Sequence, residues 1–191
     1  MEAIENLMSE HRTILAAIEA LVAFSDSVRH GAEDRPELGR FVRFIKEFAD
    51  QHHHGKEEGL LFEAMIEAGF PREMGPVGMM LHDHVLGRRF VATLAELAGQ
   101  AAPWGHGERE RLVVAAQGYA ALLRAHIHKE DAILYPMAAQ RLPPPLVARV
   151  EAGCAEADLA AGGARAELER LAGELVRRHV PGLSAGARAA G

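Results

Sequence analysis

The sequence predicts an all-α protein: an up-down-up-down four-helix bundle followed by a C-terminal helical extension. Four consecutive segments repeat apolar residues at steps of three and four, which is the period of one helix face. Glycine and proline separate these segments, and short connections favour antiparallel neighbours in a bundle. No segment alternates apolar and polar residues with period two, so we expect no sheet.

The first two predicted helices, over 2–29 and 37–68, carry polar side chains on their apolar faces. These faces consist of Ile4, Leu7, His11, Ile14, Ile18 and Leu21, and of Val42, Ile45, Ala49, His53, Glu57, Leu60 and Ala64. Gly31 and Pro36 mark the break between the two helices, and Gly69 ends the second. Because residues three and four apart share a helix face, the histidines and the glutamate point into the bundle.

The third and fourth predicted helices, over 74–99 and 108–140, repeat this arrangement. Their apolar faces consist of Val77, Met80, His84, Val91, Leu94 and Ala98, and of Leu112, Ala115, Tyr119, Leu122, His126, Glu130, Ile133 and Met137. Pro136 lies inside the fourth pattern. Since proline removes a helical hydrogen bond, we expect this helix to kink or end there.

A repeat of 73 residues relates the two halves of the bundle. It pairs His11 with His84, His53 with His126, Lys56 with Lys129, and Glu57 with Glu130. Burying a histidine or glutamate without a partner costs a few kcal/mol, so six such groups in one core need a common partner. Imidazole together with carboxylate suits iron and related transition metals. The predicted metal ligands are therefore His11, His53, Glu57, His84, His126 and Glu130.

Length and composition exclude several classes of protein. With 191 residues, 49% of them hydrophobic, the chain can form one domain with a real core. A net charge of −6 without a basic block argues against nucleic-acid binding. The single cysteine, Cys154, excludes a disulfide framework and fits the reducing cytoplasm. The acidic N-terminus and the lack of a run of about 18 apolar residues predict neither a signal peptide nor a membrane span.

We divide the chain into the bundle, 1–141, and a C-terminal extension, 142–191. The extension has a short apolar face of Leu168, Leu171 and Leu175, which Gly162 and Gly163 interrupt upstream. This pattern predicts a helix that caps or lies along the bundle, and a separate partner-binding element is the alternative. From Pro181 on we expect a flexible tail.

On these residues the chain resembles the hemerythrin-like HHE cation-binding domains. The resemblance covers about 1–140 and rests on Glu10-His11, His53-x-x-Lys56-Glu57-Glu58 with Leu61-Phe62, Gly75-Pro76-Val77 leading to Asp83-His84, and His126-x-x-Lys129-Glu130 with Leu134-Tyr135-Pro136. The family implies a four-helix bundle that holds two Fe ions in an oxo- or hydroxo-bridged centre. By that resemblance His11 and His53 would serve one iron, His84 and His126 the other, and Glu57 and Glu130 would bridge them.

The sequence departs from the oxygen-carrying hemerythrins at two positions. Arg88 stands where those carriers place a second histidine on the third helix. Glu130 follows His126 by four residues, where the carriers use an aspartate at five. Fewer histidines leave more open positions on the metals, which disfavours reversible oxygen carriage and leaves room for reactivity or sensing.

Several side chains lie next to the predicted ligands. Tyr119 shares the face of His126 and is interpreted either as a hydrogen-bond donor near the metal or as a core tyrosine. His54 is turned by about 100° from His53 on an α-helix, so we expect it to face solvent, with an extra ligand as the alternative. His52 is expected to face solvent as well.

The remaining charged neighbours follow the same repeat. We expect Glu58 and Asp131 to face solvent or to hydrogen-bond a ligand histidine. Lys56 and Lys129 are expected to be solvated, and Arg88 to pair with a carboxylate or reach the surface.

The function that we expect is that of a nonheme diiron protein that binds or reacts with a small diatomic ligand, O2 or NO, or with peroxide. Its site would have an apolar wall of Ile14, Leu60, Leu122 and Ile133. One alternative is a non-catalytic iron-handling or sensor module that signals to a protein partner through its C-terminal helix. Others are an oxidoreductase that consumes peroxide or NO, and a bundle that holds Zn or Mn. Steady-state turnover would distinguish an enzyme from a carrier or sensor.

Overall fold

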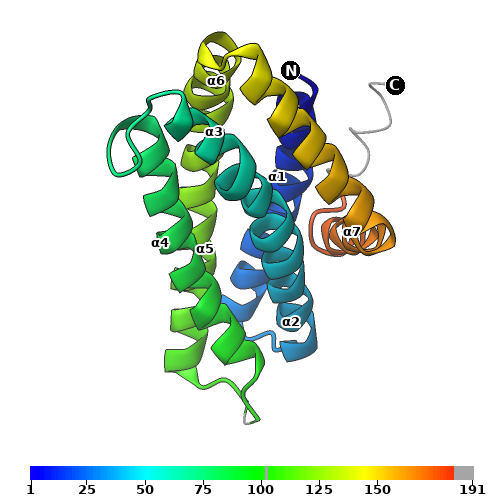
Figure 1. Cartoon of the computed structure of the whole chain (residues 1–191). Coiled ribbons are helices and arrows are strands. Elements are labelled where there is room, and N and C mark those ends of the chain that lie inside the picture. The colour runs from blue at the N-terminus through cyan, green and yellow to red at the C-terminus, as the bar shows by residue number, and fades with distance from the viewer. Residues whose placement is uncertain (102, 183–191) are drawn as a thin grey trace.

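The computed structural model describes residues 1–101 and 103–182, and this part of the chain contains helices and no strand. Four helices run up and down as an antiparallel bundle and a further helix follows, which confirms the predicted fold (Figure 1). The first and third bundle helices are α1 (Glu2–Arg29) and α4 (Gly75–Ala98). The second consists of α2 (Arg35–Phe44), η1 (Ile45–His54), η2 (Glu57–Leu61) and α3 (Phe62–Glu67). The fourth consists of α5 (His106–Lys129), η3 (Glu130–Leu134) and α6 (Tyr135–Arg141).

The helix ends lie where the sequence places its breaks. The Asp34 side chain caps α2 by accepting a hydrogen bond of 2.9 Å from the backbone N–H of Glu37. Gly31 and Gly69 follow α1 and α3 with φ of 102° and 97°. A residue with a side chain is strained in that left-handed conformation, whereas glycine is not, so glycine suits both positions.

The elements η1, η2 and η3 are π-helical turns inside otherwise continuous helices. In η2 and η3 the N–H groups of Phe62 and Tyr135 donate to the carbonyls of Glu57 and Glu130, five residues back. The two turns stand 73 residues apart, so they belong to the repeat. Such π turns are rare and often mark functional sites.

The predicted kink or end at Pro136 is only partly right, because the helix continues to Arg141. Pro136 occupies the first turn of α6, directly after the π turn η3. The wide turn has already displaced the regular hydrogen-bond ladder there, so the missing N–H of proline disrupts little. The equivalent turn η2 forms with Glu63 in the position that matches Pro136, so a π turn here does not require the proline.

The apolar core falls into two clusters. One includes Ile14, Ile18, Phe41, Val91 and Leu123, and the other includes Leu7, Leu61, Phe62, Leu134 and Tyr135. Along each bundle helix the predicted ligands lie between the residues of the two clusters. One residue of the predicted apolar wall is wrongly placed: the side chain of Ile133 is 51% exposed, on the outer face of the fourth helix.

The C-terminal extension forms α7 (Pro144–His179), which lies against the bundle (Figure 1). Gly162, with φ of 30° and ψ of −109°, breaks it into two arms, as the two glycines predict. The second arm buries Leu168, Leu171 and Leu175 in the same cluster as Phe41. Pro181 and Gly182 form a turn, and the rest of the expected tail lies outside the described residues.

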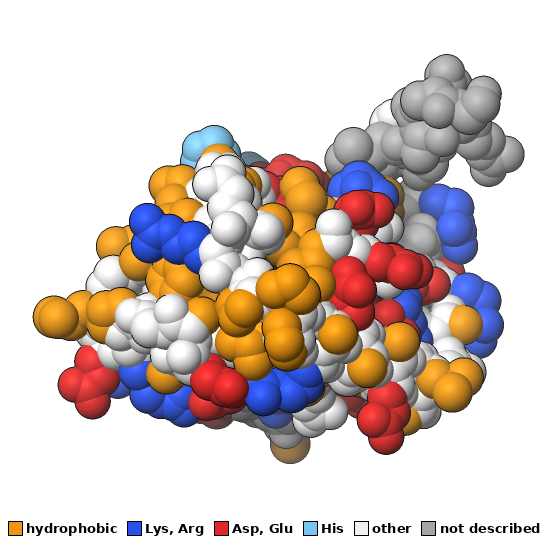
Figure 2. All heavy atoms as spheres, turned by 45° about the horizontal axis from the view of Figure 1, so that its top comes forward, with side chains coloured by type: hydrophobic (Ala, Val, Ile, Leu, Met, Phe, Trp, Pro, Cys, Tyr) orange, Lys and Arg blue, Asp and Glu red, His pale blue; other side chains and the backbone are white. Residues whose placement is uncertain are grey.

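The surface carries both charges side by side. Acidic, basic and hydrophobic side chains intermingle on the face in Figure 2, and ion pairs such as Arg124–Glu19 join neighbouring helices. Exposed pairs contribute only about 0–1 kcal/mol each, so the stability of the bundle rests on its core. Among the described helices, none has both the length and the apolarity to cross a membrane.

Candidate metal centre

The six predicted ligands and His54 meet in one buried layer of the bundle. Their donor atoms form two groups, and within each group the atoms lie within 4.8 Å of one another. The groups are His11, His53, Glu57 and Glu130, and His54, Glu57, His84 and His126. All seven residues are buried. Glu57 belongs to both groups, so the two candidate metal positions share a carboxylate.

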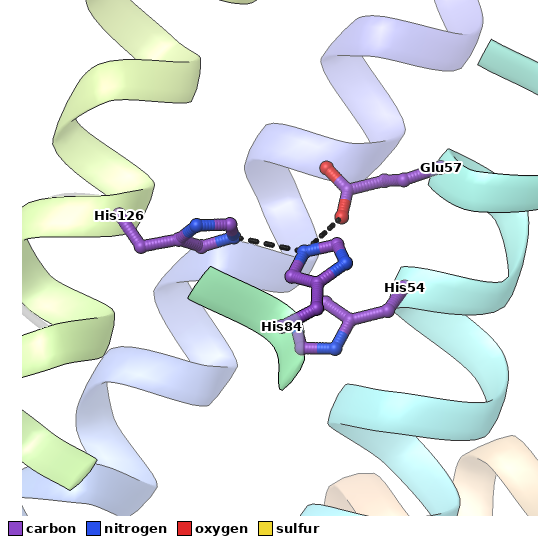
Figure 3. A group of neighbouring side chains, drawn as sticks. All are labelled: His54, Glu57, His84 and His126. Carbon is purple, nitrogen blue, oxygen red and sulfur yellow. Dashed lines mark hydrogen bonds and ion pairs between the residues drawn. The ribbon is translucent and has the colours of Figure 1, made fainter. Parts of the chain in front are cut away.

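The residues of the second group come from three bundle helices, and Figure 3 shows how their side chains converge. His126 projects from α5, His84 from α4, and both His54 and Glu57 from the second bundle helix. The Nε2 atom of His84 lies 3.0 Å from Nε2 of His126 and 3.5 Å from Oε2 of Glu57. The ring of His54 stacks on that of His84 with a centroid distance of 3.8 Å.

Each of the four histidines at the predicted positions has a carboxylate beside its Nδ1 atom. These carboxylates belong to Asp131 for His11 (2.8 Å), Glu10 for His53 (2.9 Å), Glu58 for His84 (2.7 Å) and Asp83 for His126 (3.4 Å). Because a carboxylate only accepts, Nδ1 carries the hydrogen, and in the neutral imidazole Nε2 presents a lone pair to the interior. Carboxylates in this position typically orient histidines that bind metals.

The inward Nε2 atoms lie beside carboxylate oxygens. The two oxygens of Glu130 lie 3.3 Å from Nε2 of His11 and 3.2 Å from Nε2 of His126. Neither of these oxygens, nor Oε2 of Glu57, has a hydrogen-bond partner of acceptable geometry, although all three are buried. Unpaired buried acceptors are costly, and a cation between them would satisfy the nitrogen and oxygen atoms together. The residues therefore fit a metal ion in each group.

Burial holds most of these imidazoles in the neutral form that binds metals. It lowers the pKa of His53 to about 4, and together with neighbouring histidines it lowers the pKa of His54 and of His84. His11 differs: burial opposes protonation, but the hydrogen bond to Asp131 and the nearby charge of Glu130 raise its pKa to about 9. Without metal His11 thus holds a proton at neutral pH, which a metal must displace.

The two central carboxylates differ in charge. Burial and the charge of Glu130 raise the pKa of Glu57 well above its usual value. Burial also acts to raise the pKa of Glu130, but His126 and His11 bring it well below the usual value. Like charges in one buried site favour protonation of one partner, here Glu57.

The prediction that His54 faces solvent is wrong, because its side chain is only 6% exposed and lies in the second group. The reason is the π-helical geometry of η1, which ends at His54. A π-helix turns less per residue than an α-helix, so two consecutive histidines can both point inward. This third imidazole stands in the group whose helix α4 carries Arg88 in place of a second histidine.

The predictions of a solvated Lys56 and a solvent-facing His52 are also wrong. Lys56 is 3% exposed, and its Nζ donates to Glu10 at 2.6 Å and to Asp158 of α7 at 2.7 Å. His52 lies 3.2 Å from both of these carboxylates. The three residues Glu10, His52 and Asp158 could offer metal donors, but Lys56 and Arg165 already pair with both carboxylates. We interpret them as an ion-pair network rather than a metal site.

The expectations for Glu58, Asp131 and Arg88 are confirmed. Glu58 and Asp131 accept hydrogen bonds from predicted ligand histidines, and Arg88 pairs with Asp50 and Glu58. The prediction of a solvated Lys129 is wrong, because this side chain is only partly exposed and donates to Asp83 at 2.5 Å. Each charged residue around the site therefore has a partner that fixes it.

Sequence reasoning missed Tyr135 as a site residue. Its hydroxyl donates a hydrogen bond of 2.6 Å to Oε1 of Glu57, and its ring stacks on His11 with a centroid distance of 5.6 Å. The repeat gives the signal that could have found it. The residue 73 positions earlier is Phe62, whose ring stacks on His84 but has no hydroxyl.

Replacing Tyr135 by phenylalanine is expected to lower the free energy of unfolding of the metal-free protein by about 1–3 kcal/mol, since a buried carboxyl loses its donor. Urea denaturation measures this change. Tyr119→Phe is the matched control, because the Tyr119 hydroxyl makes no hydrogen bond to the described residues although the ring is buried. Equal effects of the two substitutions would contradict a special role for the Tyr135 hydroxyl.

Tyr119 itself lies next to the site but away from its centre. It lines a cavity together with His54, His84 and Gly87. Burial raises the pKa of its hydroxyl above the usual value, so this group stays protonated at neutral pH.

Comparison with known proteins gives one finding. A family model described as the hemerythrin HHE cation binding domain matches residues 2–138 of the chain. No curated protein and no solved structure gives a significant match. The matched residues include both groups of candidate ligands and stop before α7.

Proposed function

Because this chain belongs to the hemerythrin HHE cation-binding family, we propose that it is a nonheme diiron protein that binds or reacts with O2, NO or peroxide. The observation that carries this proposal is the pair of buried donor groups that share Glu57. Imidazole and carboxylate in this ratio suit iron, and zinc or manganese are the substitutes that the same donors accept.

In this proposal His11 and His53 would hold one iron, and His84, His126 and His54 would hold the other. Glu57 and Glu130 would lie between the two positions, which agrees with the contacts of the Glu130 oxygens to a histidine on either side. Bound iron would supply the electrons and open coordination positions that O2, NO or peroxide requires.

The rest of the site would position these groups and limit access of water. Glu10, Asp83, Glu58 and Asp131 fix the four imidazoles through their Nδ1 atoms. Tyr135 holds a proton at its hydroxyl, 2.6 Å from Glu57. The apolar clusters on both sides keep the layer in a low dielectric, which strengthens every charge interaction within it.

The first experiment is metal analysis with visible absorption, on protein prepared without oxygen and then exposed to it. One iron in each group and new charge-transfer bands on exposure are the expected result. Stoichiometric zinc, or no metal after careful loading with ferrous iron, would overturn the diiron proposal.

Replacing His54 by alanine is expected to remove the iron of the second group and leave that of the first. The first group has its own histidines, His11 and His53, whereas the second loses one of three imidazoles. Iron content per chain and Mössbauer spectra measure the loss. His82→Ala, at an exposed position of α4, is the control. Full iron content in the His54 variant would exclude His54 as a ligand.

A sensor module is the second candidate, and one network favours it. Asp158 of α7 contacts Lys56, Lys56 contacts Glu10, and Glu10 accepts the Nδ1–H of the proposed ligand His53. Changes in charge at the metal would thus reach α7 through three contacts. Hydrogen exchange of α7 that differs between ferrous and ferric protein, without turnover of peroxide or NO, would favour the sensor.

A further inference from the structure

A lysine, a carboxylate and a predicted ligand histidine form a chain of contacts in the first half of the bundle. Lys56 donates to Oε1 of Glu10 at 2.6 Å, and Nδ1 of His53 donates to Oε2 of the same carboxylate at 2.9 Å. His52 also lies 3.2 Å from Oε1 of Glu10. In this buried place the ammonium withdraws negative charge from the carboxylate, which then accepts the Nδ1–H bond less strongly. The lysine therefore acts on the imidazole of His53 through the carboxylate.

The second half of the bundle repeats this chain with a different geometry. Lys129 and Nδ1 of His126 both approach Oδ2 of Asp83, at 2.5 and 3.4 Å. Because the two donors share one oxygen, the lysine competes with the histidine, whose bond is longer than the usual length of about 2.7–3.2 Å. The side chain of Lys129 is 29% exposed, so water weakens the effect of its charge. The two lysines thus occupy equivalent places but act on their carboxylates with different strength.

Ion pairs of the described residues link α7 to the first chain and not to the second. Asp158 accepts from Nζ of Lys56 at 2.7 Å, and Nη2 of Arg165 lies 3.7 Å from Oε1 of Glu10. The charge of Asp158 thus offsets that of the ammonium, whereas Arg165 adds a second positive charge beside Glu10. These two side chains of α7 therefore change the acceptor strength of Glu10 and leave Asp83 as it is.

Stability does not account for these buried charges. Removal of an ammonium and a carboxylate from water is costly, and a buried ion pair is often no more stable than packed apolar residues. A carboxylate at Nδ1 raises the basicity of an imidazole as a metal ligand, and removal of such partners changes metal affinity by about 10–100-fold. A charge that alters the acceptor strength of the carboxylate therefore alters the donor strength of the histidine.

We propose that Lys56 and Lys129 are positioning residues, which set through their carboxylates how strongly the histidine of each chain donates electrons to a bound metal. Asp158 of α7 adjusts this setting only at the position of His11 and His53. The effect on a metal rests on the proposed function, whereas the effect on the Nδ1–H bond does not. The C-terminal helix thereby tunes one of two metal positions that the repeat makes equivalent.

Proton NMR of the metal-free, full-length protein with ¹⁵N-labelled histidine tests the effect on the hydrogen bond. A stronger carboxylate acceptor moves the Nδ1–H resonance of its histidine downfield. Asp158→Asn leaves the ammonium of Lys56 to act on Glu10 alone, so we expect the His53 resonance to move upfield. Lys56→Met is expected to move it downfield. The resonance of His126 should stay unchanged in both variants, which makes it the internal control.

Lys129→Met is a further variant that keeps the test valid if Lys56→Met, which leaves buried carboxylates with fewer partners, does not fold. Lys129 is partly exposed, so its replacement disturbs the core less. We expect a downfield shift of the His126 resonance and no shift at His53. Arg124→Met is the matched control, because it removes the same charge from an exposed ion pair with Glu19 on the same helix.

The second measurement is a redox titration of the iron-loaded protein, in which a mediator of known potential donates one electron to each ferric iron. Mössbauer spectra measure the ferrous product at each position. Asp158→Asn is expected to favour the ferrous form at the position of His11 and His53 by roughly tenfold, which is about 59 mV for one electron. Lys56→Met should favour the ferric form there by a similar factor, because a more basic imidazole stabilises the higher charge.

The signs of these shifts separate tuning from a role in packing alone. A network that only holds helices together is loosened by either substitution, so shifts of the same sign in Asp158→Asn and Lys56→Met would overturn the inference. An unshifted His53 resonance in folded Asp158→Asn would overturn it as well. Shifted resonances with unchanged potentials would overturn its metal part. Failure to bind iron, together with the expected NMR shifts, would overturn the diiron function but not the control of the Nδ1–H bond.

Discussion

Replacing Glu57 by glutamine is expected to abolish iron binding at both positions without lowering the stability of the metal-free protein. Glu57 is the one carboxylate that belongs to both donor groups. Its loss should lower metal affinity by more than the about 10–100-fold that removal of an outer-shell partner costs. Iron content after anaerobic loading measures the effect.

The expected stability of the metal-free Glu57→Gln variant follows from the protonation state of Glu57, not from metal binding. Burial and Glu130 raise the pKa of Glu57, so its ionised form destabilises the metal-free fold. Glutamine carries no charge, and its carbonyl oxygen can still accept from the Tyr135 hydroxyl. We therefore expect a melting temperature at or above that of the metal-free wild type. Glu63→Gln, at a half-exposed position further along the same helix, is the control.

An iron content equal to that of the wild type in Glu57→Gln would contradict the shared-carboxylate arrangement. A lower melting temperature of the metal-free variant would show instead that Glu57 is ionised and stabilising there. The two measurements thus test the metal role and the protonation state separately.

Loading the metal-free protein with ferrous iron is expected to raise its melting temperature, and to raise it more at pH 8 than at pH 6. A ligand at about 100 times its Kd stabilises by about 2.7 kcal/mol, which is roughly 5–10 °C for a domain of this size. The pH dependence follows from His11, whose pKa of about 9 in the metal-free protein means that a proton must leave when the metal binds. Below that pKa, each fall in pH strengthens the competing proton and weakens metal binding.

Differential scanning calorimetry at the two pH values measures this effect. Mg²⁺ is the control ion, because it prefers oxygen ligands and should bind poorly among imidazoles. If iron loading raises the melting temperature by the same amount at pH 6 and pH 8, His11 does not exchange a proton for the metal.

The contact between α7 and the ligand layer gives the extension a role beyond covering the bundle. Asp158 neutralises Lys56, and Lys56 in turn holds Glu10 beside His53. These residues come from three helices, and the matched family model ends at residue 138. The extension thus supplies ion-pair partners to the charged residues beside His53.

The sequence by itself determined the all-α fold and the inward faces of the four bundle helices. Steps of three and four place His11, His84 and their partners on apolar faces, and burial of those faces requires a bundle. The repeat of 73 residues predicted two equivalent halves, and the structure does bring the six predicted ligands together. Periodicity sufficed here because it reports which face of a helix is buried.

Only the tertiary structure decided the finer composition of the site. The π turn η1 directs His54 inward, and an ideal α-helical wheel cannot show this change of direction. Tyr135 and Lys56 find their partners on other helices, and Gly87 leaves a cavity where Ile14 fills the equivalent place. Contacts between helices depend on their relative height and rotation, which a one-dimensional pattern does not contain.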